Sequence, residues 1–484
     1  MVSQIMQAAA LAVRSWLIIS TLATCAAANA QTAVDDRLLI DVDGGRWGIS
    51  VRAVDGSAEL TANGNQRFMP ASTLKLVTTA AALHFLGDFE NGGWPRGTAL
   101  LIKQGPDAPL PSLILRGSGD ATLSDDEACE ASCLSQFVDA VQAQGIARVQ
   151  DIIIDDSLFQ KSYWPSGWAQ DDLRFAFGAA VSALTVDDAT AHATIAPGTQ
   201  IDTPPILTWL DLPAFNVDVS QAHTVLHGFD LDFLKRPGSR WAEIKGTIGL
   251  HTGRVPLRFG LDDPSIYAGE LFRKRLAESG VLVEGKILRS EEAPVRTDSN
   301  LPPRLLFQHP APDPMKTMGE ILHESNNLHS EVLLHHVSLT LRDRTSESGL
   351  RLLEHLLIES GADQHDFNIA DGSGLSSYNR ITPDAMTGLL VWATRQPWYE
   401  SWSGLLAANG KDGTLEYRLP RGVQEGAVRA KSGTMFGVDG LAGYFRSESG
   451  RDYAFTIFLN DSAMSHAEAR ERIDALIRSL IETL

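Results

Sequence analysis

A helix predicted over residues 70–83 must lie in the interior of the folded chain. Between Phe68 and Gly87 the only formal charge is Lys75, and apolar residues occupy more than one face of the helix. A helix that is apolar on several faces is usually buried, and Pro70 suits its first turn. A lone buried ammonium is costly. Lys75 is therefore either a lysine that reaches solvent from a helix end or a catalytic amine, with Ser72 one turn before it.

Two further segments favour the catalytic interpretation. Ser325 and Asn327 form an S-x-N motif within a stretch, residues 315–341, that is predicted to be helical. Residues 428–434 are predicted to form a strand that carries Lys431-Ser432-Gly433, with further strands at 441–446 and 453–459. Each motif alone is weak. The order S-x-x-K, S-x-N, K-[ST]-G, with the first on a buried helix and the last on a strand, is typical of serine β-lactamases and penicillin-binding proteins.

The chemistry of acyl transfer explains these residue types. A serine hydroxyl needs a base within hydrogen-bond reach, and Lys75 can be that base if burial and the like charge of Lys431 lower its pKa. Ser325 can relay a proton to the leaving amine. Asn327 can hold Lys75 and bind a substrate amide. Lys431 and Ser432 are expected to bind a substrate carboxylate, and Gly433 to let the substrate approach the strand closely. The N–H groups of Ser72 and Thr434 are expected to donate to the oxyanion.

The length of the chain requires more than one domain. The 484 residues suggest about three domains, and about 250 of them separate Lys75 from Ser325, too many for a loop. Strand-like runs at 112–115, 149–154 and 242–248 indicate at least one inserted domain. A net charge of −19, without a cluster of Lys and Arg, excludes nucleic acid as a partner.

The first thirty residues have the pattern of a secretory signal, with cleavage after Ala30. A membrane anchor is the alternative, although the apolar run is short for a span. Export would remove Cys25 and leave Cys129 and Cys133, which an oxidising compartment permits to pair. Their helical i, i+4 spacing is near the upper limit of disulfide geometry. Free thiols are the alternative, and we expect neither a metal site nor a cofactor.

Four further blocks extend the resemblance beyond the motifs. Residues 115–123 (LRGSGDATL) are similar to a family block GSGDPTL, residues 177–188 (FGAAVSALTVDD) to YGAPVSALSVDDN, and residues 371–376 and 412–415 also match. Together they resemble the low-molecular-mass class C penicillin-binding proteins, the D-alanyl-D-alanine carboxypeptidase/endopeptidases. The resemblance runs from about Trp47 to the C-terminus.

The resemblance implies a multidomain fold of the α+β or α/β class. A serine β-lactamase-like transpeptidase domain, with an antiparallel sheet and a helical cluster, is expected at 31–98 and 306–484. A large, mostly β insertion of two nested domains interrupts it, at 99–180 with 240–305 and at 181–239. The C-terminal segment 467–484 is amphipathic. We expect it to pack on the sheet, with a membrane-surface anchor as the alternative.

The implied function is a periplasmic serine-type D-Ala-D-Ala carboxypeptidase, with D,D-endopeptidase activity as a further expectation. Its partners are peptidoglycan stem peptides and, as covalent inhibitors, β-lactam antibiotics, with no stable membrane span after signal cleavage. Asp172 matches an acidic residue that in relatives binds the amine of diaminopimelic acid; a solvated surface acid is the alternative. Ser377 and Phe436 stand where the family often has an arginine and a polar residue.

Three alternative functions remain. A serine β-lactamase would share the motifs, but the sequence identifies no dedicated deacylating base, and the long insertion also argues against it. A non-catalytic peptidoglycan-binding protein would have lost a catalytic residue. The five expected catalytic residues are all present in the sequence: Ser72, Lys75, Ser325, Asn327 and Lys431. A zinc peptidase would need a motif such as H-E-x-x-H. His323-Glu324 lacks the second histidine, and His335-His336 is expected on the surface.

Overall fold

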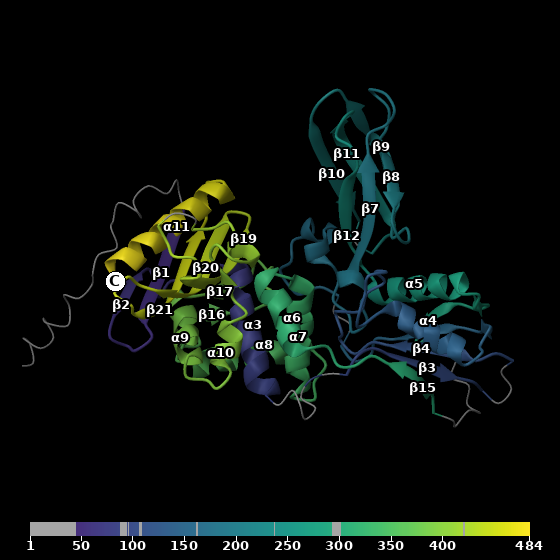
Figure 1. Ribbon diagram of the computed structural model, residues 1–484, viewed down its shortest axis with the longest axis horizontal. Helices are drawn as coiled ribbons and strands as arrows, with labels where there is room; N and C mark the ends of the chain where they lie inside the picture. The colour runs from purple at the N-terminus through teal and green to yellow at the C-terminus, as the bar shows by residue number, and fades with distance from the viewer. Residues whose placement is uncertain are drawn as a thin grey trace, which may run out of the picture.

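Strands from both ends of the chain form the central sheet of the first lobe (Figure 1). The computed structural model describes residues 45–87, 94, 96–105, 109–160, 163–236, 238–292, 302–419 and 422–484. The sheet is antiparallel throughout, and the predicted strands at 428–434, 441–446 and 453–459 are confirmed in it. Its six strands lie in the order β18 (Ala407–Ala408), β19 (Val428–Met435), β20 (Val438–Arg446), β21 (Asp452–Asn460), β1 (Arg46–Ala53) and β2 (Glu59–Ala62).

Helices cover both faces of this sheet, so β20 and β21 are buried along nearly their whole length. On one face α11 (His466–Thr483) packs its apolar stripe against alternate residues of β1, β20 and β21, as expected for the C-terminal segment. The other face meets a cluster of helices around α3 (Lys75–Leu86). That cluster comprises α6 (Pro314–His323), α7 (Asn327–Leu339), α8 (Ser346–Glu359), α9 (Pro383–Ala393) and α10 (Tyr399–Ser403), beside the small ribbon of β16 (Phe367–Asn368) and β17 (Arg380–Ile381).

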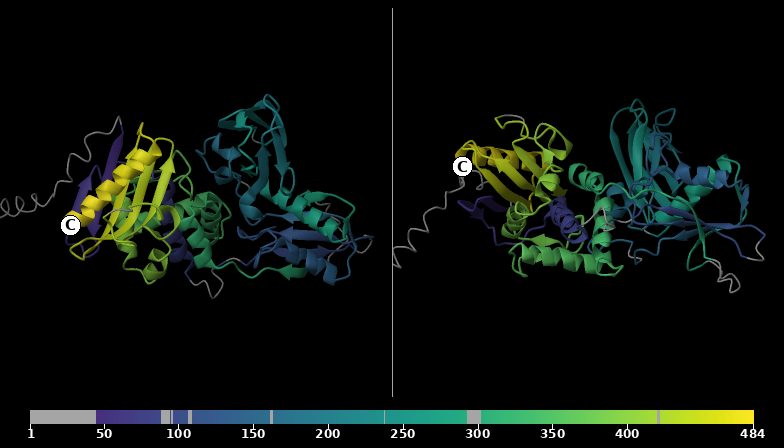
Figure 2. Two further views of the ribbon diagram at one scale, coloured as in Figure 1. Left: turned by 45° about the horizontal axis from the view of Figure 1, so that its top comes forward. Right: turned by 60° about the horizontal axis from the view of Figure 1, so that its bottom comes forward.

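The residues between α3 and α6 form a second lobe (Figures 1 and 2). Its base is a mixed sheet in which β14, β6 and β4 are parallel and β3 and β15 are antiparallel. Helices α4 (Leu134–Ala143) and α5 (Pro264–Glu278) bury an apolar core against it. The strands are β3 (Ala99–Lys103), β4 (Ser112–Arg116), β6 (Ile152–Asp155), β14 (Ile287–Arg289) and β15 (Arg304–Gln308), with the short pair β5 (Arg148–Val149) and β13 (Leu282–Val283).

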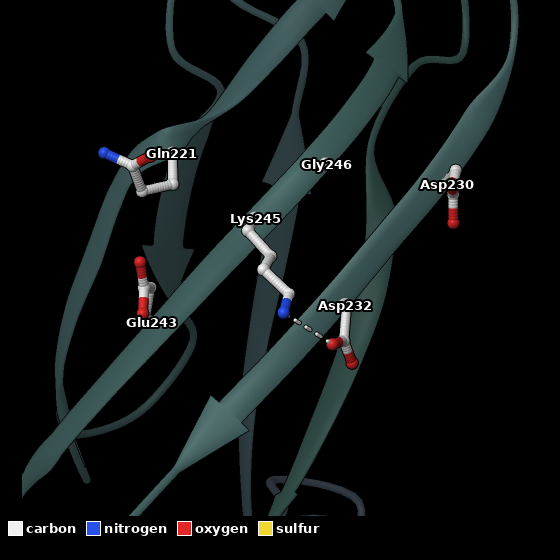
Figure 3. A pocket seen from close by; sticks show the side chains of 6 residues that line it. All are labelled: Gln221, Asp230, Asp232, Glu243, Lys245 and Gly246. Atoms are coloured by element: carbon white, nitrogen blue, oxygen red, sulfur yellow. Dashed lines mark ion pairs between the residues drawn. The ribbon is translucent and has the colours of Figure 1, made fainter.

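Two three-stranded sheets project from this base as a nested unit (Figure 1). Their inner faces share an apolar cluster. The outer face of one sheet is polar, and there Lys245 lies 3.5 Å from Asp232, directly across from it in the strand register (Figure 3). The sheets are β12–β7–β8 and β10–β11–β9, built from β7 (Thr190–Ala196), β8 (Ile206–Trp209), β9 (Asn216–Val225), β10 (Phe229–Lys235), β11 (Trp241–Gly249) and β12 (Val255–Gly260).

The strand pairings move two predicted domain boundaries. The nested unit was expected to end at residue 239, yet β11 pairs with β9 and β10, and β12 pairs with β7. It therefore extends to Gly260. The catalytic domain was expected to resume at residue 306, but β15 completes the base sheet by pairing with β3. Both errors have one cause, since the partner of a strand is fixed by contacts distant in sequence.

One face of α7 packs against the second lobe and includes the histidine pair expected on the surface. That expectation was wrong, because His335 and His336 are both buried. The His336 Nε2 atom bonds to the carbonyl oxygen of Gly119 at 2.8 Å, and the His335 ring stacks on Phe159 with centroids 4.4 Å apart. Burial lowers the pKa of each imidazole to about 4, so both are neutral at pH 7. They join the two lobes.

The predicted signal segment, residues 1–30, lies outside the described residues. Within the described part of the chain, no helix is both long enough and apolar enough to cross a membrane.

Candidate active site

A sharp turn sets Ser72 at the start of the buried helix. The predicted helix begins later than expected: residues Ala71–Leu74 form a 3₁₀ turn and α3 starts at Lys75. Ala71 has φ 47°, in the left-handed region that few residues other than glycine adopt. The carbonyl oxygen of Pro70 accepts hydrogen bonds from the N–H and hydroxyl of Thr73, which close the turn. Ser72 is half-buried, while Thr73 and Leu74 are buried.

Lys75 is fully buried, and its amine is held by three oxygen atoms. Its Nζ lies 2.9 Å from Ser72 Oγ, 2.6 Å from Asn327 Oδ1 and 2.7 Å from the carbonyl oxygen of Ser373. Burial lowers the pKa of Lys75 to about 7, and the nearby carboxylates of Asp371 and Glu331 act in the opposite direction. The amine therefore exchanges between charged and neutral forms near neutral pH, and the neutral form can accept the Ser72 proton.

The second motif lies at a break between two helices, so the continuous helix predicted over 315–341 was wrong. Chain direction changes at Ser325, whose φ is 63°. The Asn326 side chain then caps α7 by accepting from the N–H of His329. Ser325 is half-buried, and no atom of the described chain is hydrogen-bonded to its hydroxyl. The hydroxyl is therefore free to exchange a proton with a bound molecule.

Asn327 connects Lys75 to the inserted lobe. Its Oδ1 atom accepts from Lys75, and its Nδ2 donates to the carbonyl oxygen of Phe177 at 2.9 Å. Phe177 opens one of the sequence blocks noted above. The sequence predicted the contact with Lys75 but not the one with Phe177, which uses one of the two amide protons expected to serve a substrate.

The third motif lies on β19, beside the turn that carries Ser72. Lys431 is fully buried and donates to the carbonyl oxygen of Ser432 at 3.0 Å. Burial and the charge of Lys75 lower the pKa of Lys431 well below its usual value. Ser432 is half-buried and Thr434 is exposed.

Packing within the protein also explains why residue 433 is glycine, in addition to the predicted approach of a substrate. A Cβ at this position would lie 2.8 Å from the carbonyl oxygen of Pro70 and 3.1 Å from the nitrogen of Ser72. Only glycine lets β19 approach the turn that carries Ser72 so closely. This contact brings the N–H of Ser72 close to the strand that carries Thr434.

Asp172 lies in the inserted lobe, in a short 3₁₀ turn, Asp172–Arg174. It is half-buried, and burial together with neighbouring Asp171 raises its pKa. Its backbone packs on Gly178, next to the Phe177 whose carbonyl holds Asn327. Asp172 is thus on the segment that touches Asn327 of the second motif.

Cys129 and Cys133 form a disulfide with their Cα atoms 5.6 Å apart. The sequence suggested that the two cysteines lie one turn apart on a helix. Instead both precede α4, and Cys133 is its N-cap. The bond lies in the inserted lobe and fixes the entry to that helix.

Two buried carboxylates near Lys75 had no role in the sequence prediction. Glu331 lies on α7 and Asp371 on the loop after β16, and both are at most 1% exposed. Asp371 accepts a hydrogen bond from Trp168 of the inserted lobe at 2.9 Å. A signal was present for Glu331: it is the only formally charged residue of α7, as Lys75 is in its own helix.

Comparison with known proteins identifies this arrangement. The sequence profile of the D-Ala-D-Ala carboxypeptidase 3 (S13) family matches residues 30–482. The chain is 29% identical over 435 residues to a D-alanyl-D-alanine carboxypeptidase of Actinomadura sp. (strain R39), covering 85% of this chain and 77% of the relative. It is 26% identical over 436 residues to D-alanyl-D-alanine carboxypeptidase DacB of Haemophilus influenzae, covering 86% and 85%.

A solved structure shares the fold. The crystal structure of penicillin binding protein 4 (dacB) from Haemophilus influenzae superposes with a TM-score of 0.78 at 22% identity, covering 92% of this chain and 98% of that one. The expected penicillin-binding-protein fold is thus the fold of this chain.

Proposed function

Because the chain belongs to the D-Ala-D-Ala carboxypeptidase 3 (S13) family, we propose that it is a serine-type D-Ala-D-Ala carboxypeptidase acting on peptidoglycan stem peptides. The observation that carries this proposal is the contact of Lys75 Nζ with Ser72 Oγ, at 2.9 Å, on a fully buried lysine. A nucleophile and a base in direct contact, with the pKa of the base near 7, are the requirements for acyl transfer at neutral pH.

In the first step neutral Lys75 takes the hydroxyl proton of Ser72, and Oγ bonds to the carbonyl carbon of the penultimate D-alanine. The N–H groups of Ser72 and Thr434 stabilise the oxyanion. The intermediate collapses with cleavage of the peptide bond, and the leaving amine of terminal D-alanine takes a proton from Lys75 through Ser325. A water molecule then loses a proton to Lys75 and attacks the acyl carbon, and Lys75 returns that proton to Ser72 Oγ as the acyl group leaves.

Lys431 and Ser432 bind the terminal carboxylate of the substrate. Burial disfavours the charged form of Lys431 in the free protein. An approaching carboxylate favours that form, so binding of the substrate and protonation of Lys431 strengthen each other. A β-lactam presents a similar carboxylate beside its strained amide and acylates Ser72 by the same route.

The pocket for the peptide side chain combines Asp172 with residues that differ from the family pattern. We assign Asp172 to the amine of a diaminopimelic acid residue, since its half-buried carboxylate lies on the segment that touches Asn327. Ser377 donates to the carbonyl oxygen of Gly167, and Phe436 is fully exposed. Arg380 is bonded to carbonyl oxygens of its own loop, so it does not replace the arginine missing at Ser377.

The location that we propose for the protein is the periplasm, reached by export. It rests on the signal pattern of residues 1–30 and on the substrate, which lies outside the cytoplasm.

Digestion of purified muropeptides tests the reaction. We expect the wild-type protein to convert a pentapeptide monomer to a product lighter by one alanine residue, and Ser72→Ala to leave it unchanged. Mass spectrometry of the products also reports endopeptidase activity, which converts cross-linked dimers to monomers. A folded wild-type protein that alters neither substrate would contradict the proposal.

A further inference from the structure

Two buried acids next to Lys75 take no part in the mechanism above. Glu331 comes from α7, one turn after Asn327, and Asp371 comes from the loop that also supplies Ser373. Neither forms a direct ion pair with Lys75 among the described contacts. Glu331 contacts the N–H groups of Gly372 and Ser373, while Lys75 contacts the carbonyl oxygen of Ser373. A buried carboxylate without a cation in contact is costly, so each needs an explanation.

The hydrogen bonds of the Asp371 carboxylate explain why an acid is buried in this loop. Its two oxygens accept from the N–H groups of Gly374 and Ser376, from Nδ2 of Asn379 and from Nε1 of Trp168. These donors come from its own loop and from the inserted lobe. Asp371 therefore shapes the loop and attaches it to the second lobe.

Glu331 makes a different set of contacts, all directed at the backbone that holds Lys75. Its Oε1 atom accepts from the N–H of Ser373 at 2.7 Å and of Gly372 at 3.0 Å, and Oε2 accepts from Gly372 at 3.1 Å. The carbonyl oxygen of Gly372 in turn accepts from Thr78 of α3 and Ser330 of α7. The next carbonyl, of Ser373, is the one that accepts from Lys75.

The charge of Glu331 also bears on the lysine. The charged groups around this cluster are Lys75 on α3, Asp371 on the loop and Lys431 on β19, with Glu324 acting on Lys431. Burial, followed by the charge of Asp371, acts to raise the pKa of Glu331, whereas the backbone N–H groups of Gly372 and Ser373 donate to its two oxygens and hold the ionised carboxylate. Burial lowers the pKa of Lys75 to about 7. An ionised Glu331 favours the protonated lysine, and a neutral Glu331 favours the free amine.

We propose that Glu331 is a positioning residue for Lys75: it holds the backbone whose carbonyl oxygen orients Nζ, and its negative charge favours the protonated form of the lysine. This inference rests on the function proposed above for Ser72 and Lys75. It makes α7 the support of the general base as well as the carrier of Asn327.

Glu331→Gln separates the charge from the position. Glutamine keeps an oxygen that can accept from both N–H groups, but it carries no charge. Without that charge Lys75 loses its proton more readily. The rise of the acylation rate on the acidic side of its pH profile should therefore occur about one pH unit lower than in the wild type. We expect at least about a tenth of the wild-type plateau rate. The measurement is the second-order rate of labelling by a fluorescent penicillin from about pH 5 to about pH 9.

Glu331→Ala removes the oxygens as well, so buried N–H groups of Gly372 and Ser373 lose their partners. The labelling rate of this variant should be more than about tenfold below that of the wild type across the whole pH range, plateau included. Glu354→Gln, on α8 and away from Lys75, is the matched control and should show the wild-type profile.

The results that would overturn the inference are distinct. An acid limb at the wild-type pH in Glu331→Gln rejects the role of the charge, and a wild-type plateau in Glu331→Ala rejects the positioning role. Should Glu331→Ala not fold, the near-isosteric glutamine variant still decides through its pH profile. A wild-type protein that is not labelled at any pH would instead contradict the proposed function.

Discussion

Replacing Lys75 with methionine should slow acylation by penicillin by about 10²–10⁴-fold, the usual contribution of a general base. Methionine fills a similar volume without a charge. Because the substitution leaves the acceptor oxygens of Asn327 and Ser373 without this donor, the rate is compared only for variant protein that circular dichroism shows to be folded. The hydroxyl of Ser72 remains in place but loses the amine 2.9 Å away that would take its proton.

The rate of fluorescent-penicillin labelling measures this effect. Wild-type labelling should rise with pH through about pH 7, since only the neutral amine of Lys75 accepts a proton. Lys75→Met should lose that dependence. Lys316→Met, at an exposed position of α6, is the control. A Lys75→Met variant that is folded and labelled at the wild-type rate would rule out Lys75 as the base.

Gly374→Ala should destabilise the catalytic domain by about 2–5 kcal/mol, combining the cost of a left-handed alanine with that of an overpacked contact. Gly374 has φ +87°, and a Cβ there would lie 1.9 Å from the carbonyl oxygen of Ala71. Neither atom belongs to a flexible side chain. The loop that supplies the Ser373 carbonyl must therefore move away from the turn that carries Ser72, and acylation should weaken as well.

Thermal unfolding followed by circular dichroism checks this prediction. The midpoint should fall by at least about 4 °C. Gly450→Ala is a matched control, because Gly450 has a similar φ of +83° but nothing within 4 Å of an added Cβ. It bears only the conformational cost and should shift the midpoint less. Equal shifts in the two variants would show that the contact between Gly374 and Ala71 is not tight.

The residues of the candidate site could be predicted because their patterns are local. A single charge in an apolar helix marked Lys75, and its spacing from Ser72 followed from helix geometry. The strand with Lys431 was predicted from its run of β-forming residues and from the strands after it. In the structure Lys75 contacts Ser72 and Asn327 directly.

What could not be predicted depends on contacts between distant segments. The break at Ser325 interrupts a sequence with good helical character, and the bond from Asn327 to Phe177 joins residues 150 positions apart. The burial of His335 and His336 arises only because the inserted lobe covers that face of α7.

The insertion contacts the candidate site, and the helix and loop beside it, at several points. Phe177 binds Asn327, Trp168 binds Asp371, and Asp188 binds His329 on α7 at 2.8 Å. Three neighbouring residues around Asp188 have positive φ, an arrangement that needs support from its surroundings. The sequence predicted that an inserted domain separates the first two motifs. The contacts show that it also holds the second motif in place.

The most direct test of the account is the site of covalent modification by penicillin. Intact-mass spectrometry of the wild-type protein should show the addition of one whole penicillin molecule, and peptide mapping should place it on Ser72. Ser72→Ala should show no addition. An adduct on a different residue, or a folded wild-type protein that gains no mass, would contradict the central claim that Ser72 is the nucleophile.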